Sequence, residues 1–587
     1  MKKFAIAFSF AMAMFAHAAP PYVGYLYPAS LQCGTTNRII VGGQNFWADI
    51  RCMVSGKGVK ILDVERVPGF SPPTGMQRRY LVKWLDAIAE GKREKPPLPD
   101  DPHLNEWRSN SWWNVLGELD AQKISLVERY LHVPPNPLQA SPSLRQKVLV
   151  TIAVDKDAEI GSRKFAVSVL NGMSPPRPLL ITKEPQIEER LFVPVKRRDL
   201  SPVKAGKIPA VLNGQIMPGE TDRFELDLEA GTKIALQTIG REFQPYIGDA
   251  VPGFFNPVLR ILDPDGKECA FADDNGFHPD PVVAFTPAKT GKYILEIRDN
   301  LFRGREDFVY SILVSKDGEK TSYENLGIWK TPVAEIKDGR VFKGTVTEKG
   351  RSVRHRINIA SAGKYAFDLR ARRIGSRLDA RMALRDRDGK ILKKFDDIEE
   401  TVHVGALIQG ECDPRGVFEF GKPGTYEIEI ADASAFAGKD YFYELSIAKE
   451  KPGVEIWMSA SGLAGRPWAS ASIDFHVIRK GGFSGSVKIL PSKDLSFKPS
   501  VIPAGTNSMP VRVFLTTEKE YRFKNVDIKA EVVLDGKKTI VPVNTGDKYN
   551  QAFAWDHILP ADSFLIRRYP PPPPKKKKLP NNAGKRP

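Results

Sequence analysis

Apolar and polar residues alternate along most of the chain, and turns rich in glycine, proline or aspartate interrupt the alternation. Phe224, Leu226 and Leu228 alternate with acidic residues, and a segment at 473–477 follows the same pattern. A period of two places every second side chain on one face of a strand. The pattern predicts short strands with one buried face, and therefore a mainly β fold built from tandem β-sandwiches.

One stretch near the N-terminus has a helical period instead. Eight apolar residues mark the buried faces of two helices: Leu81, Trp84, Leu85, Ile88, Leu119, Ile124, Val127 and Leu131. Asp120 is the predicted N-cap of the second helix. Alternating segments precede and follow this stretch. We therefore expect an immunoglobulin-like β-sandwich at residues 19–75 plus 138–186, with a helical hairpin inserted at residues 76–137.

Residues 205–316 and 335–448 carry the same series of short motifs. The first copy has an Asp263-Pro-Asp-Gly266 turn, and the second has Asp386-Arg-Asp-Gly389. A pair of adjacent aspartates begins ten residues after the first Asp of the turn in both copies. This agreement predicts two copies of one β-sandwich module. His355 falls near the place that Phe224 has in the first copy.

The C-terminal part divides into a folded unit and a tail. Alternation and an Asp535-Gly536 hairpin turn predict a second immunoglobulin-like sandwich at residues 452–545. Residues 567–587 contain five consecutive prolines followed by four lysines. Such a segment buries too little apolar surface to order itself, so a disordered tail is predicted there.

The N-terminus has the features of a secretory signal peptide. Lys2 and Lys3 precede an apolar stretch, and Ala16-His17-Ala18 follows it with the small-x-small pattern of a cleavage site. The apolar stretch is short for a bilayer span. We expect residues 1–18 to be removed and the mature chain, without a transmembrane span, to be secreted or periplasmic in a bacterium.

The distribution of charged residues limits the classes of partner that the protein is expected to bind. The formal net charge is +17, but the signal segment and the tail carry much of it, so the folded part is only mildly basic. The lysine tail lacks the interleaved aromatic residues that stack on bases. Outside the cytoplasm, anionic envelope polymers suit a basic tail better than nucleic acid, and no nucleic-acid partner is expected.

The duplicated module resembles the pre-peptidase C-terminal domain, a β-sandwich of secreted bacterial proteins. The resemblance is carried by Asn213-Gly214-x-Ile216, Asp222-x-Phe224, the turn at 263–266, Ala272-Asp273-Asp274, His278-Pro-Asp280-Pro281, Gly291-x-Tyr293 and Tyr310. The second copy lacks the His-Pro-Asp-Pro motif. The N-terminal region is similar to the TIG or immunoglobulin-like domains that begin some of these proteins. The resemblance implies secretion and a non-catalytic role in attachment or folding support.

Five aspartates of the first module form the candidate metal site: Asp263, Asp265, Asp273, Asp274 and Asp280. They concentrate carboxylates on neighbouring loops, and calcium takes six to eight oxygen ligands of this kind. Asp-Pro-Asp-Gly is also an ordinary turn, and the aspartates could cap turns or pair with Arg303 and Arg305. Apart from calcium, no cofactor is predicted.

Cys33 and Cys52 are the candidate disulfide, because they are 19 residues apart in one predicted sandwich and the expected compartment is oxidising.

No motif of a catalytic site occurs in the sequence. His-Glu-x-x-His, Gly-x-Ser-x-Gly and the phosphate-binding Gly-rich loop are all absent, and the eight histidines are scattered singly. We therefore expect a secreted, non-enzymatic protein that binds or scaffolds at the cell envelope or extracellular matrix, with a polysaccharide, envelope polymer or matrix protein as its partner. The alternative is a secreted peptidase or glycosidase, or its substrate-targeting accessory chain, because a triad can be assembled from distant positions.

Overall fold

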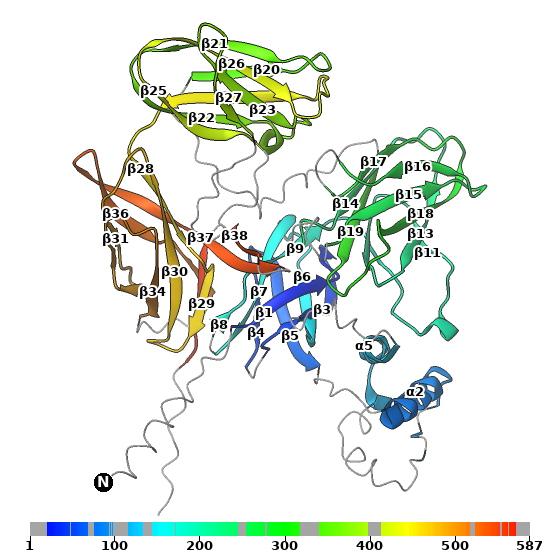
Figure 1. Cartoon of the computed structure of the whole chain (residues 1–587). Helices are drawn as coiled ribbons and strands as arrows, with labels where there is room; N and C mark the ends of the chain where they lie inside the picture. The colour runs from blue at the N-terminus through cyan, green and yellow to red at the C-terminus, as the bar shows by residue number, and fades with distance from the viewer. Residues whose placement is uncertain are drawn as a thin grey trace, which may run out of the picture.

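The computed structural model describes residues 20–570 except 47–48, 68–74, 93, 96, 98–115, 133–143, 171, 245–253, 276–278, 317–339, 397–412, 517–522, 552–554 and 562. The predicted signal peptide and the tail from residue 571 lie outside the described residues. The described chain forms four β-sandwich domains and two α-helices (Figure 1). The prediction of a mainly β fold with tandem sandwiches and a helical insertion is confirmed.

The N-terminal domain packs two sheets face to face, with strand orders β1-β3-β6-β5 and β2-β9-β7-β4. Its strands are β1 (Tyr22–Tyr27), β2 (Ser30–Gln32), β3 (Thr36–Gln44), β4 (Arg51–Val54), β5 (Val59–Val67), β6 (Gln146–Val154), β7 (Gly161–Val169), β8 (Gly172–Met173) and β9 (Arg177–Thr182). The short β8 pairs with β7. Ile39, Val41 and Val150 are buried, and so are the intervening Ile40 and Leu149, so the central strands β3 and β6 are covered on both faces.

The helical insertion lies between β5 and β6. It contains α2 (Gly75–Ala89), a 3-10 turn η1 (Leu116–Glu118) and α5 (Ala121–His132). The four apolar residues predicted for the first helix are the ones that α2 buries, Leu81, Trp84, Leu85 and Ile88. Asp120 caps α5, because its Oδ1 accepts the N–H of Lys123 at 2.9 Å. The face predicted for the second helix is confirmed in part: α5 buries Val127 and Leu131, whereas Ile124 is half-buried and Leu119 precedes the helix.

The two modules have the same topology, which confirms the internal repeat. The first has sheets β12-β19-β14-β17 and β13-β18-β15-β16, and the second has β20-β27-β22-β25 and β21-β26-β23-β24 in matching order. The first module comprises β12 (Ala210–Gln215), β13 (Thr221–Leu228), β14 (Ile234–Ile239), β15 (Pro257–Leu262), β16 (Glu268–Ala272), β17 (Val282–Phe285), β18 (Gly291–Asp299) and β19 (Val309–Lys316). Two further strands, β10 (Gln186–Glu188) and β11 (Val203–Gly206), pair in parallel with β12 and β13. A 3-10 turn η3 (Val195–Arg197) lies between them.

The second module comprises β20 (Arg340–Thr345), β21 (Val353–Ile359), β22 (Gly363–Arg370), η4 (Arg372–Ile374), β23 (Ala380–Arg385), β24 (Ile391–Phe395), β25 (Arg415–Phe420), β26 (Gly424–Asp432) and β27 (Phe442–Lys449). Phe224 of β13 lies opposite Leu295, and His355 of β21 lies opposite Ile428. Because Leu295 and Ile428 hold the same place in their strands, His355 occupies the position of Phe224, as the sequence comparison predicts.

The C-terminal domain extends past its predicted end at residue 545. It comprises β28 (Gly453–Met458), β29 (Gly462–Gly465), β30 (Ser470–Lys480), β31 (Val487–Ile489), β32 (Leu495–Lys498), β33 (Val501–Ile502), β34 (Ser508–Leu515), β35 (Phe523–Val526), β36 (Lys529–Leu534), β37 (Lys537–Gln551), β38 (Trp555–Ala561) and β39 (Phe564–Arg568). Strand β39 lies between β29 and β35. Arg568 and Tyr569 are buried, so the prediction of a disordered tail from residue 567 is wrong at its start. The reason is that the Arg568 guanidinium finds a buried partner, the Asp494 carboxylate, at 2.8 Å.

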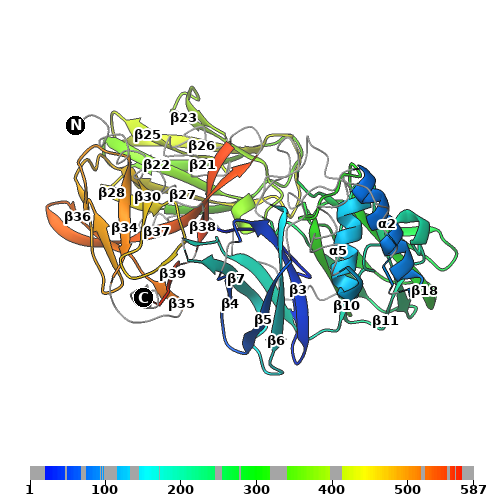
Figure 2. The same ribbon diagram turned by 90° about the horizontal axis from the view of Figure 1, so that it is seen from below.

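The N-terminal domain lies between the first module and the C-terminal domain (Figures 1 and 2). Its apolar core is continuous with residues of the first module, including Val211, Ile239 and Phe243. A smaller apolar cluster joins its Ala166 and Met173 to residues of the C-terminal domain. These shared cores hold three of the sandwiches together as one packed block.

Candidate functional site

The Asp263 turn of the first module is held by its own hydrogen bonds. The Oδ1 of Asp263 accepts the N–H groups of Asp265 at 3.0 Å and Lys267 at 2.8 Å. In the second module, Asp386 accepts the N–H groups two and four residues later at 3.0 and 2.9 Å. The carboxylate therefore acts in both copies as the cap of a tight turn.

Asp280 is buried and also caps backbone groups. Its carboxylate accepts the N–H of Gly240 at 2.8 Å and that of Arg241 at 2.9 Å. Asp413, which like Asp280 precedes a proline, accepts the N–H groups of Arg372 and Arg373 in the second module. The repeated arrangement identifies Asp280 as a structural residue that fixes the end of β14.

The remaining predicted metal ligands are exposed. Asp265 pairs with Lys289 at 2.6 Å, and Asp273 and Asp274 lie at the surface. In the described part of the chain, none of the five predicted aspartates belongs to a group of three ligand atoms within 4.8 Å of one another. Calcium binding by these five residues stays a prediction, and hydrogen bonds and an ion pair account for three of them. Arg303 and Arg305, the other predicted partners, form ion pairs with Asp299 and Asp307.

Cys33 and Cys52 are free thiols, so the predicted disulfide is wrong. Cys33 follows β2, Cys52 belongs to β4, and β9 and β7 lie between these strands. Three strand spacings separate the two residues by about 14 Å, about twice the largest Cα separation that a disulfide spans. Sequence spacing alone did not reveal that the two strands are at opposite edges of one sheet.

Among the three cysteines that the structure describes, we expect thiol labelling of the native protein to follow exposure, with Cys269 modified first and Cys52 last. Cys269 is exposed, whereas burial raises the pKa of the Cys52 thiol to about 12, which keeps it protonated and unreactive at neutral pH. Peptide mass spectrometry after timed alkylation measures the order. A Cys33–Cys52 disulfide in the unreduced protein would contradict the structure.

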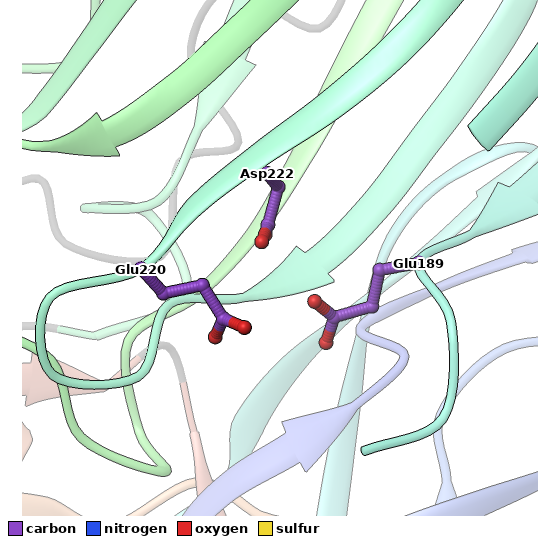
Figure 3. Close-up of side chains that lie close together, drawn as sticks. All are labelled: Glu189, Glu220 and Asp222. Atoms are coloured by element: carbon purple, nitrogen blue, oxygen red, sulfur yellow. The ribbon is translucent and has the colours of Figure 1, made fainter. Parts of the chain in front are cut away.

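A group of acidic side chains that the sequence did not reveal lies where the first module meets the N-terminal domain. Oxygen atoms of Glu189, Glu220 and Asp222, one from each carboxylate, all lie within 4.8 Å of one another (Figure 3). Glu189 follows β10, Glu220 precedes β13 and Asp222 lies within β13. We call these three residues the carboxyl cluster.

Two acids of the carboxyl cluster, Asp222 and Glu220, have partners of their own. The hydroxyl of Tyr310 donates to Asp222 Oδ2 at 2.7 Å, and the guanidinium of Arg198 binds Glu220 Oε1 at 2.7 Å. Glu189 lies close to Tyr27 of β1 and to Asp222, and its buried Oε1 has no hydrogen-bond partner in the described part of the chain. The cluster therefore lies where the N-terminal domain approaches the first module.

Glycine places Tyr310 against Asp222. Gly214 lies opposite Tyr310 in the β12–β19 pair, and a Cβ atom at Gly214 would lie 2.1 Å from the tyrosine hydroxyl oxygen. The second module repeats this arrangement with Gly344 and Tyr443, but there the hydroxyl bonds to His355 Nε2 at 2.6 Å. The polar partner has moved two positions along the strand, so the carboxyl cluster is specific to the first module.

Burial controls the charge of the cluster. Desolvation, with the charge of Glu220 second, raises the pKa of Asp222 to about 7. Desolvation and the neighbouring Asp222 raise the pKa of Glu189 well above its usual range. Arg198 already neutralises Glu220. The raised pKa values of Glu189 and Asp222 favour a single proton held between these two acids.

A cavity of about 220 Å³ opens beside the carboxyl cluster. It is lined by the segment 189–203, by the start of β13 and by Arg129 of α5. Its arginines are already occupied: Arg197 binds Glu128, and Arg190 pairs with Asp199 at 3.1 Å. The cavity thus offers a lining of mixed and largely compensated charge.

In the described part of the chain, no helix has the length and apolar composition to span a membrane.

No family model and no curated protein matches the chain. Solved structures with a weak similarity include the following two. The native conformation of E. coli alpha-2-macroglobulin is 8% identical with a TM-score of 0.11, and the alignment covers 68% of this chain but only 26% of that chain. An ectodomain fragment of ICAM-5 is 10% identical with a TM-score of 0.11, over 92% of this chain and 100% of that chain. At these TM-scores neither similarity carries an argument, and the fold assignment rests on the strand pairing described above.

Proposed function

We propose that this protein is a secreted, non-enzymatic scaffold that binds a polymer of the bacterial envelope or the extracellular matrix. The observation that carries the proposal is the packing of three sandwiches into one block around the N-terminal domain. A block of this kind holds loops and sheet faces at fixed positions, which lowers the entropy lost when an extended ligand binds several of them.

The sequence supports the location of this function. The features of residues 1–18 favour export, and the duplicated module resembles the pre-peptidase C-terminal domain, whose family implies secretion and attachment. The lysine run in the tail adds attraction to anionic polymers. Polysaccharides, envelope polymers and matrix proteins are therefore the partner classes to test.

The test is a binding array of glycans, envelope polymers and matrix proteins, probed with the mature chain with and without calcium. We expect saturable binding to at least one class and no change in the bound polymer. A chain that ends at residue 570 is the matched control, because it keeps every described strand and removes the lysines of the tail. Binding that survives this truncation belongs to the folded domains.

New reducing ends or new peptide fragments, produced in proportion to the amount of protein, would contradict the proposal and favour a hydrolase. Absence of binding to all three classes would also contradict it. Fractionation of the source cells, with sequencing of the mature N-terminus, tests export separately.

A further inference from the structure

The carboxyl cluster lies in a junction that combines an apolar core with buried polar contacts. Val309 and Leu313 of β19 belong to the core of the N-terminal domain. Around this shared core, Lys147 pairs with Glu306 at 3.0 Å. Ser30 of β2 donates to Asn213 of β12 at 2.6 Å, within a buried polar network. Any change of charge in the cluster therefore acts on a surface that joins two domains.

Few groups near the cluster can compensate a change in its charge. The charged and titratable groups that face it are Tyr27 of β1, Glu188 of β10, Arg129 of α5, Arg198 after η3 and Tyr310 of β19. Arg198 is paired with Glu220, and Arg129 donates to the Gln215 amide oxygen. The two tyrosines remain neutral, because burial raises their pKa values well above the usual range. Full ionisation of Glu189 and Asp222 would thus place two like charges side by side with one nearby arginine.

We propose that the carboxyl cluster is a proton-dependent clasp between the N-terminal domain and the first module. The clasp is closed while Glu189 and Asp222 share a proton, and it loosens when both are ionised. Loosening frees the segment 189–203, which connects β10 to β11 and lines the cavity. The junction is therefore tighter in mildly acidic surroundings than in alkaline ones.

The direction of this pH dependence follows from the linkage between proton binding and folding. The pKa of Asp222 is raised from an unfolded value near 4 to about 7 in the folded chain, so between these pH values the folded state holds a proton that the unfolded state has lost. The contribution of this group to stability is fully present at the acidic end. It is lost as the pH rises through the folded pKa.

Trypsin provides the test, because Arg190, Lys196, Arg197 and Arg198 all lie in the freed segment. The full chain is compared with the double variant E189Q/D222N, and each cleavage rate is divided by that of an unfolded peptide at the same pH. Between about pH 5.5 and 8.5 we expect the normalised rate to rise on the order of tenfold in the natural chain, since one pKa unit corresponds to a factor of ten. The double variant should change less than about twofold, because neutral amides keep the clasp closed.

Asp265→Asn is the matched control, since Asp265 belongs to the same module but is exposed and paired with Lys289. Its pH profile should follow that of the natural chain. The proposal is overturned if the double variant shows the same slope as the natural chain. It is also overturned if the double variant is cleaved rapidly at every pH, because the junction would then need the acids themselves rather than their proton.

Discussion

Deleting residues 564–587 is expected to unfold the C-terminal domain, whereas deleting residues 571–587 is expected to leave its stability unchanged. The first deletion removes β39, the central strand of the β29-β39-β35 sheet. Its Phe564 and Ile566 are buried in the core of that domain. Loss of the strand leaves β29 and β35 without a partner and exposes the core that it covers.

The same deletion also breaks a buried ion pair. Arg568 and Asp494 are both almost fully buried and lie 2.8 Å apart, so removal of the arginine leaves the carboxylate with Lys524 alone, at 3.0 Å. Removing one partner of a buried pair costs about 3 to 5 kcal/mol, because the other charge stays desolvated. Together with the lost apolar burial, this cost is a large fraction of the free energy of unfolding of a typical domain, which is about 5 to 15 kcal/mol.

Differential scanning calorimetry of the two truncated chains measures the effect. We expect the transition of the C-terminal domain to disappear from the chain that ends at residue 563 and to persist in the chain that ends at residue 570. The first chain should also lose the hydrogen bond between Tyr569 and Ser168, at 3.0 Å, and with it part of the contact with the N-terminal domain. Equal transitions in both chains would show that β39 does not belong to the fold.

Sequence patterns located the strands and helices well, because burial of one face leaves a period that can be counted. The four buried residues of α2 and the matching position of His355 and Phe224 were predicted this way. Patterns failed where a charged residue is buried with a distant partner. Arg568 lies next to a run of prolines and lysines, and only the fold shows that Asp494 is beside it.

The same limit explains the candidate sites. Glu189 and Asp222 are distant in sequence, and no sequence motif links them. They come together only in the folded chain, where β10 pairs with β12. The aspartates predicted as calcium ligands include turn and strand-end caps, and carboxylates in either role look alike in a sequence. Comparing the two modules separates the roles, because Asp386 and Asp413 repeat the hydrogen bonds of Asp263 and Asp280.

The repeat also supplies the second large expected effect, at the loop that follows β18 and its counterpart after β26. Asp299 is fully buried and accepts the N–H groups of Asn256 and Leu301, both at 3.0 Å. Asp432 occupies the same position and accepts the N–H groups of Asp379 and Ser434, both at 3.0 Å. Each aspartate thus fixes a loop on its module.

Only the first module adds an arginine. Arg303 Nε and Nη2 donate to the two oxygens of Asp299 at 2.9 and 3.0 Å, whereas Asp432 has no ion pair in the described part of the chain. Asp299→Ala is therefore expected to destabilise its module by about 3 to 5 kcal/mol. Asp432→Ala should cost about 1 to 3 kcal/mol, because it leaves backbone N–H groups unpaired but no charge.

Hydrogen exchange of the two loops in the full chain measures both effects at once, since each variant serves as the control for the other. Protection should fall more at Leu301 in Asp299→Ala than at Ser434 in Asp432→Ala. Adding Arg303→Met to Asp299→Ala should restore part of the lost protection, because the second change removes the unpaired charge. Two results would contradict this prediction: equal losses of protection in the two single variants, or no recovery in the double variant. Either result would show that the backbone hydrogen bonds alone stabilise the loop and that Arg303 does not contribute.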